Sequence, residues 1–146
     1  MKFLSFLLPA AALCVLFQSS GPSTIDPMIF ALRVSKNEVP TLPTQAQWMV
    51  SLHDADGQLL VQFPFKANAH VQRCILPPQK KGIYTASFYL DLNGNHHLDK
   101  GFFGQPTEPY AFSNEARGMF SAPSLEDQRF LFDGQEIPVL LQYHFK

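Results

Sequence analysis

Charged residues are scarce in this sequence. Asp, Glu, Lys and Arg together make up 16% of its 146 residues, and the formal net charge is -1 at pH 7. Proteins that bind nucleic acids or anionic membranes through electrostatic attraction carry clusters of Lys and Arg. This sequence contains no basic stripe or polybasic run. We therefore expect no nucleic-acid partner.

Cysteine is nearly absent as well, since Cys14 and Cys74 are the only copies. No Cys-x-x-Cys pair exists, which excludes structural zinc held by thiolates. Cys14 lies in an apolar N-terminal run and follows Leu13, whereas a lipidated cysteine should follow a small residue. If that run is removed, Cys74 stands alone and no intramolecular disulfide can form. The apolar surroundings of Cys74 predict a buried side chain rather than a reactive thiol.

No apolar run reaches the roughly 20 residues that a membrane-spanning helix needs. Lys2 precedes an apolar run over residues 3–17, which ends in small and polar residues. This order is typical of a secretory signal peptide, with an uncleaved anchor as the alternative. We expect residues 1–23 to be removed and residues 24–146 to form the mature domain, exported to the periplasm or outside the cell, with no transmembrane segment.

Phenylalanine, proline and glycine are frequent instead, with 14, 12 and 8 copies. This composition favours many short strands separated by turns. The patterns predict strands over residues 28–34, 48–53, 58–65, 69–76, 83–90, 129–132 and 137–145. About seven short strands with short connections predict an all-β fold, a single antiparallel β-sandwich of the Ig-like or prealbumin-like kind.

Some positions within this sandwich can also be predicted. Pro64 lacks a backbone donor, which indicates that its strand lies at a sheet edge. The strand over 83–90 is apolar on both faces, as a central strand is. Residues 77–82, which begin with two prolines, predict a turn. We expect the strand over 129–132 to form a hairpin with the last strand across residues 133–136.

Oxygen-bearing side chains are concentrated in residues 91–99. They occupy the first, third, fifth and ninth positions, the spacing at which one loop can surround calcium. His96 stands where such loops carry glycine, and Phe102 stands where they carry a bidentate glutamate. The alternative is an Asn-Gly turn whose Asp side chains accept backbone amides. The predicted calcium ligands are Asp91, Asn93, Asn95, the carbonyl of His97, Asp99, and Glu108 or Asp127 from the following segment.

Residues 101–128 show no strand pattern but carry signals of order. Ser113 can begin a short turn that Gly118 ends, and Ser124 to Asp127 approximates a capping box. A long connection of this kind is usually functional when it is ordered. We expect a packed flap over one end of the sandwich, anchored by Phe102, Phe103, Tyr110, Phe112, Met119 and Phe120.

The segments from residue 82 to residue 127, taken in order, resemble the bacterial family catalogued as domain of unknown function (DUF) 2141. Members of that family usually carry glycine where His96 stands and a basic residue where His97 stands. The resemblance implies an exported bacterial β-sandwich and supplies no reaction. It is carried by Asp91, Asn93, Gly94, Asn95, Leu98, Asp99, Gly104, Pro106, Glu108, Phe112, Ser113, Asn114, Ala116, Arg117, Gly118, Pro123, Glu126 and Asp127.

A transition-metal site is a second hypothesis for the same loop. His96 and His97 lie beside Asp91 and Asp99, and imidazole together with carboxylate suits zinc or copper. Adjacent residues in a turn rarely point at one ion, so exposed loop histidines are the simpler interpretation.

Catalysis by carboxylates is a third hypothesis. Asp91 with Glu108, or Glu126 with Asp127, could act as acid and base in a hydrolase. The sequence contains no nucleophile elbow, phosphate loop or zincin motif that would support a reaction. We expect Glu108 to form a salt bridge with Arg117 that pins the flap.

A non-enzymatic role is the favoured interpretation. Aromatic side chains, Trp48, Tyr110, Phe112 and Phe120, could form a shallow platform for a glycan or a partner chain, or could simply be core. We expect a binding or structural module of the cell envelope with calcium as its one cofactor and an envelope protein or glycan as partner. A hydrolase using carboxylates of residues 91–127 is the alternative. The predicted ligand surface comprises Tyr110, Phe112, Ser113, Asn114 and Arg117.

Overall fold

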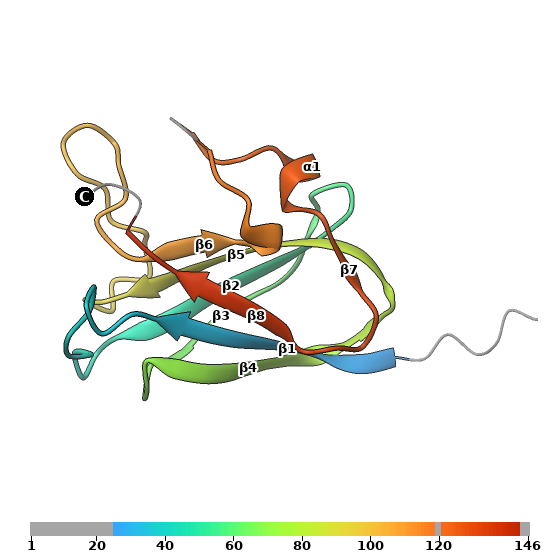
Figure 1. The fold of residues 1–146 in the computed structure, drawn as a ribbon, viewed down its shortest axis with the longest axis horizontal. Helices are drawn as coiled ribbons and strands as arrows, with labels where there is room; N and C mark the ends of the chain where they lie inside the picture. Colours follow the sequence, from blue (N-terminus) through green and yellow to red (C-terminus); the bar gives the residue numbers. More distant parts are fainter. Residues whose placement is uncertain (1–24, 119–120, 144–146) are drawn as a thin grey trace, which may run out of the picture.

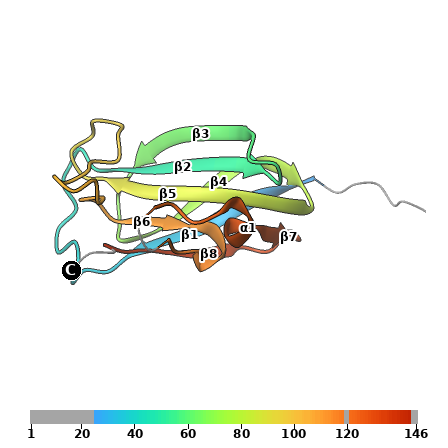
Figure 2. The same cartoon turned by 90° about the horizontal axis from the view of Figure 1, so that it is seen from above.

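The computed structural model describes residues 25–118 and 121–143, which form two β-sheets packed face to face (Figure 1, Figure 2). Most of the strands alternate buried and exposed side chains, as strands with one covered face do. The elements are β1 (Ile25–Val34), β2 (Gln47–Asp54), β3 (Leu59–Lys66), β4 (Val71–Lys80), β5 (Gly82–Asp91), β6 (Tyr110–Phe112), η1 (Ser113–Glu115), α1 (Leu125–Gln128), β7 (Phe130–Phe132) and β8 (Ile137–Leu141).

The first sheet has the strand order β4-β1-β8, and the second has the order β3-β2-β5-β6, with β7 also paired to β5. All pairs are antiparallel except β1 with β8, which is parallel. The all-β sandwich predicted from the sequence is therefore confirmed. The edge position of β3, which contains Pro64, and the interior position of β5 are confirmed as well.

The core lies between the facing sheets and explains their alternation. Phe30 of β1 and Trp48 of β2 are fully buried, and the rings of Phe30 and Phe88 meet edge to face with centroids 4.8 Å apart. Such aromatic contacts add to the stabilisation from buried apolar area. The described core extends from Met28 to Leu141, so a chain that starts at residue 24 contains all of it.

The turn predicted at residues 77–82 is wrong, because β4 continues through both prolines to Lys80. β4 is an edge strand, where a residue without a backbone donor is tolerated. The pairing also shifts there, since Pro27 lies opposite Pro78 while Met28 lies opposite Leu76. This irregularity leaves Pro77 without a partner residue, as β-bulges do.

The hairpin predicted between residues 129–132 and the last strand is also wrong. β7 pairs with the beginning of β5, and β8 pairs with β1 in the other sheet. β6 covers only residues 87–89 of β5, which leaves residues 82–84 free to pair with β7. The segment after β7 therefore crosses from one sheet to the other.

The last strand ends at Leu141, earlier than predicted, and residues 144–146 lie outside the described part. Gln142 then exchanges two backbone hydrogen bonds with Tyr110 of β6, with N to O distances of 3.1 and 3.2 Å. This bridge links the two sheets along one side. Within residues 25–118 and 121–143, no helix is long and apolar enough to span a membrane.

Candidate functional site

The loop of residues 91–108 projects from the end of the sandwich at which β5 finishes (Figure 1). Asp91 is fully buried at its base. Its Oδ1 accepts the Gly94 amide at 2.7 Å, and its Oδ2 accepts the His96 amide at 2.8 Å. A carboxylate that accepts several amides holds a tight turn in one conformation. His96 has the positive φ of 65° that its glycine-like position requires.

The other polar side chains of this loop bind one another. Oδ1 of Asn93 accepts the Asn95 amide at 3.0 Å, and Oδ1 of Asn95 accepts the His97 amide at 2.8 Å. The carboxylate of Asp99 accepts hydrogen bonds from Nδ2 of Asn93 and of Asn95, at 2.6 and 2.9 Å. The structure thus brings Asp91, Asn93, Asn95 and Asp99 into one loop, as the spacing suggests, while the side chain of His97 is exposed.

Glu108 holds the two ends of this loop together. It is buried, and its two oxygens accept the Leu92 amide at 2.7 Å and the Asp99 amide at 3.2 Å. Burial raises the pKa of Glu108, partly offset by these two amides, and the charges of Asp91 and Asp99 raise it further. The salt bridge predicted between Glu108 and Arg117 is wrong, because Glu108 faces the loop and Arg117 donates to Oε1 of Gln142 at 2.9 Å.

The described residues contain no cluster of three or more His, Cys, Asp or Glu side chains suited to a metal ion. Nε2 of His96 lies 3.4 Å from the amide nitrogen of the Gln47 side chain. The side-chain oxygens of residues 91–99 all accept hydrogen bonds from within the loop, which is the geometry of an Asx-rich turn.

Ser113, a member of the predicted ligand surface, is buried, and Trp48, for which a platform or a core position was open, is buried as well. Oγ of Ser113 accepts the Ala86 amide at 2.8 Å, and Nε1 of Trp48 donates to Gln72 at 3.2 Å. A buried hydroxyl or indole needs such partners, which is why these side chains serve the fold. Asn114 is exposed and donates to the carbonyl of Asp127. Met119 and Phe120 lie outside the described residues.

The flap is packed only in part. Ser124 caps α1 by accepting the Asp127 amide at 3.2 Å, as its capping box predicts. Phe102 and Phe103, predicted as anchors, are instead 97% and 88% exposed. We call these two residues the tip. Apolar side chains are usually buried, so the sequence predicts that these two belong to the core. Their exposure depends on the direction in which the loop points, which the sequence does not reveal.

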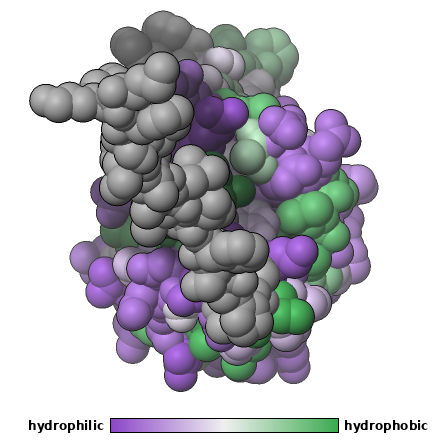
Figure 3. All heavy atoms as spheres, turned by 90° about the vertical axis from the view of Figure 1, so that its right-hand side faces the viewer, coloured by the Kyte–Doolittle hydropathy of each residue, from purple (hydrophilic) through white to green (hydrophobic). Residues whose placement is uncertain are grey.

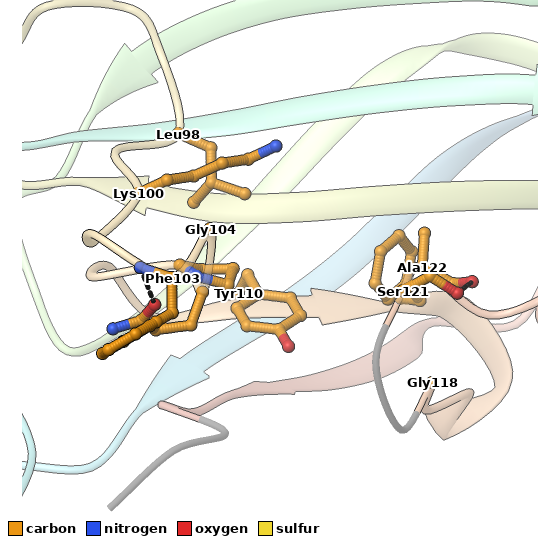
Figure 4. Close-up of a pocket in the computed structure, with 11 residues that line it drawn as sticks. Leu98, Lys100, Phe103, Gly104, Tyr110, Gly118, Ser121 and Ala122 are labelled. Carbon is orange, nitrogen blue, oxygen red and sulfur yellow. Dashed lines mark hydrogen bonds between the residues drawn. The ribbon is translucent and has the colours of Figure 1, made fainter.

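A cavity of about 710 Å³ lies beside Tyr110 and Phe112 (Figure 4). Leu98 and Lys100 stand on one side of it, Ser121 and Ala122 stand on the other, and Tyr110 lies between them. Its size falls in the range of small-ligand sites, roughly 300 to 1,000 Å³. The lining residues are Leu98, Lys100, Phe103, Gly104, Gln105, Pro106, Tyr110, Phe112, Gly118, Ser121 and Ala122.

Two members of the predicted ligand surface, Tyr110 and Phe112, belong to this cavity. They are half-buried, their rings meet edge to face with centroids 5.9 Å apart, and burial raises the pKa of the Tyr110 hydroxyl. Asn114 and Arg117 line a separate, smaller cavity of about 120 Å³. Sequence reasoning missed Leu98, Gln105 and Ala122, because nothing in their spacing shows that two distant segments face each other.

The opposite end of the molecule offers a contrast. Figure 3 views that end, and where grey atoms do not cover it, polar and apolar side chains are interspersed. Among the described residues, no other large apolar side chain is as exposed as the tip, and Leu131 follows at 67%. The cavity and the tip therefore mark the end with loop 91–108 as the candidate site.

Comparison with known proteins gives the following results. One solved structure that the chain resembles is the fimbrial anchor protein Mfa2 from Porphyromonas gingivalis, with 14% identity and a TM-score of 0.43. The match covers 82% of this chain and 50% of that protein, so the chain spans about half of its length. No curated protein sequence matches significantly. The model of the family described as "Uncharacterized protein conserved in bacteria (DUF2141)" matches residues 44–139. Because that match covers more than half of the chain, the protein belongs to the DUF2141 family.

Proposed function

We propose that this chain is exported and acts as a non-enzymatic binding module of the bacterial cell envelope, with the cavity beside Tyr110 as its binding site. The proposal of export rests on the signal-peptide pattern of residues 1–23. Loops held at one end of a rigid β-sandwich are where such domains commonly bind ligands.

The lining of the cavity is the observation that carries this proposal. Three aromatic rings, from Phe103, Tyr110 and Phe112, are combined with the polar ends of Lys100 and Gln105. Aromatic faces with a few hydrogen-bonding groups at the rim are typical of ligand-binding sites.

The carboxylates of the region favour binding over hydrolysis. Of the described residues, none that lines the cavity is Asp or Glu. Asp91 and Glu108 are buried and accept backbone amides, so neither is free to act as acid or base on a ligand in that cavity. A general acid or base must lie within hydrogen-bond reach of the reacting group.

A glycan is the ligand class that fits this lining best. The apolar face of a sugar ring stacks on an aromatic ring, while its hydroxyls accept from donors such as Lys100 and Gln105. Tyr110 and Phe112 are half-exposed and so present ring surface to a ligand. A protein partner would also use aromatic anchors, but it would bury a larger area than this cavity provides.

Blocking the cavity tests this function. Ala122 lines the cavity and is exposed, so Ala122→Trp fills the space without disturbing the core. Ala69→Trp, at another exposed alanine that does not line the cavity, is the matched control. Residues 24–146 are incubated with insoluble peptidoglycan, sedimented and quantified in the pellet.

We expect the wild type and Ala69→Trp to sediment with the glycan and Ala122→Trp to remain in solution. Equal sedimentation of both variants, or no sedimentation of the wild type, would contradict a glycan site in this cavity. Export is checked separately by fractionating cells that express the full chain, and cytoplasmic retention would contradict it.

Calcium is a separate proposal for loop 91–108. Asp91, Asn93, Asn95 and Asp99 lie in one loop, and carboxylate and amide oxygens are the ligands that calcium prefers. A bound ion would compete with the internal hydrogen bonds of the loop, so the affinity would be modest. Calcium would then stabilise the loop rather than take part in chemistry.

A further inference from the structure

The tip exposes more apolar surface than any other pair of side chains in the described part of the chain. Phe102 is 97% exposed and Phe103 is 88% exposed, and the two rings meet at right angles with centroids 5.2 Å apart. A phenylalanine side chain presents roughly 150 to 250 Å² of surface that gains free energy when it leaves water. An exposed pair of this kind indicates an interaction site.

The turn that carries the tip is well defined. The Gly104 amide donates to the carbonyl of Gly101 at 2.9 Å, and the Gly101 amide donates to the carbonyl of Gln105 at 2.7 Å. Gly104 has a φ of 81°, which glycine adopts without strain. Phe102 and Phe103 occupy the two corner positions of this turn, and the side chains of both are largely exposed.

Three exposed lysines lie at the same end of the sandwich as the tip. Lys66 and Asp91 both lie opposite Gln47, at the end of the sandwich from which the loop projects, and Lys36 follows the end of β1 there. Lys36, Lys66 and Lys100 are exposed. The acidic groups nearby, Asp91, Glu108, Asp99 and Glu38, are buried or half-buried. These lysines are far apart in the sequence, so they form no polybasic run, and only the fold brings them to one end of the domain.

From this geometry we propose that the tip inserts into a phospholipid bilayer that contains anionic headgroups. Phenylalanine carries no polar atom, so the tip offers a partner no hydrogen bond and suits a hydrocarbon phase. A convex tip of two rings can enter a bilayer directly, whereas a protein partner must supply a matching pocket. The exposed lysines at the same end would meet the phosphates of the headgroups. Phe103 also lines the proposed glycan cavity, so the inference is tested at Phe102, which does not line it.

Vesicle sedimentation tests this inference. Residues 24–146 are used, because the apolar run of residues 3–17 would itself partition into lipid. The vesicles contain equal parts of phosphatidylglycerol and phosphatidylcholine, and pure phosphatidylcholine vesicles are compared. Phe102→Ser removes one ring of the tip and leaves the cavity lining intact, and Leu131→Ser removes an exposed apolar side chain in β7, at the opposite end of β5.

We expect the wild type and Leu131→Ser to bind the anionic vesicles and Phe102→Ser to bind at least about tenfold more weakly. Binding to phosphatidylcholine alone should be weaker, and added salt should weaken binding to the anionic vesicles. Absence of vesicle binding, or equal binding by Phe102→Ser, would overturn the inference. The alternative is that the tip binds a second copy of the chain. Analytical ultracentrifugation without lipid tests it, because a wild-type dimer that Phe102→Ser dissociates would assign the tip to self-association and overturn the inference.

Depth of insertion gives an independent readout. Trp48 is the only tryptophan and is fully buried, so Phe102→Trp adds one exposed reporter to a constant background. Insertion predicts a blue shift of its emission and quenching by brominated acyl chains. An unshifted spectrum in the presence of vesicles would show that the ring stays in water and would contradict the proposal.

Discussion

Ser113 and Ala86 are joined by a hydrogen bond of 2.8 Å, in which the amide of Ala86 donates to Oγ of Ser113. The hydroxyl of Ser113 in turn donates to the carbonyl of Gln128. β6 pairs with residues 87–89 of β5 and β7 pairs with residues 82–84, so Ala86 lies in the gap between them. The buried hydroxyl of Ser113 therefore accepts the amide that no strand reaches on this side of β5, and it links the flap to the sheet.

Ser113→Ala should destabilise the domain by about 1 to 3 kcal/mol, because it leaves a buried amide and a buried carbonyl without partners. Urea unfolding of residues 24–146 measures this change. Thr107→Ala, at an exposed position of the neighbouring loop, is the control and should cost far less. Equal effects of the two substitutions would contradict the bridging role of Ser113.

The patterns that predicted the fold correctly are those in which burial alternates. Phe30 and Leu32, like Val50 and Leu52, alternate with more exposed residues, and this period of two marks strands whatever the topology. Pairing is different, because a strand of three residues carries no information about its partner. The sequence pattern therefore predicts only the nearest strand, β8, as the partner of β7. The structure instead pairs β7 with residues 82–84 of β5, which β6 leaves unpaired.

The candidate site was predicted less completely. The spacing of Asp91, Asn93 and Asn95 indicates a loop with converging oxygens, because all of these positions are local. The cavity joins Leu98 and Lys100 to Ser121 and Ala122, which only the folded flap brings together. Exposure of the tip was not predictable, since the same aromatic residues would be core if the turn pointed inward.

Cys74 should resist thiol reagents in the folded protein. Burial raises its pKa to about 12, and its side chain is 2% exposed. The thiolate is the reactive form, so at mildly alkaline pH the folded protein contains almost none. Reaction with a disulfide reagent should proceed at the rate of unfolding and become rapid in urea. Fast stoichiometric reaction under native conditions would contradict the buried position.

Glu108 should make the stability depend on pH. Burial raises its pKa above the ordinary value of 4.5. Between pH 4.5 and the raised pKa, the folded state therefore keeps a proton that the unfolded chain has released. Its contribution is fully present below pH 4.5 and is lost as the pH rises through the raised pKa.

Unfolding free energies of the wild type and Glu108→Gln, measured from acidic to neutral pH, test this dependence. Glu108→Gln does not titrate, so the stability advantage of the wild type over it should shrink as the pH rises. Glu126→Gln, at an exposed position of α1, is the control for loss of one carboxylate elsewhere. A difference that grows with pH would contradict a raised pKa.

His96 and Gly94 should respond in opposite directions to a change of side chain. Both have positive φ, 65° for His96 and 75° for Gly94. His96→Gly relieves an unfavourable conformation and should stabilise the domain by up to about 1 kcal/mol, less the entropy that glycine loses on folding. Gly94→Ala should destabilise it, because the added Cβ would also lie 3.1 Å from the carbonyl of Gln45. Thermal unfolding of the two variants measures both effects.

Calcium should raise the melting temperature of residues 24–146 if loop 91–108 binds it, by an amount that grows with calcium concentration. The domain is unfolded in excess chelator and then at increasing calcium. Asp91→Asn removes a proposed ligand and also weakens the turn, so the quantity compared is the increment due to calcium. Asp99→Asn removes a ligand nearer the surface, and Asp56→Asn controls for loss of one exposed charge elsewhere. A calcium increment in the wild type and Asp56→Asn that both loop variants lose would establish an ion site. No increment, or one that the loop variants keep, would contradict an ion site and leave the loop as a turn held by its own hydrogen bonds.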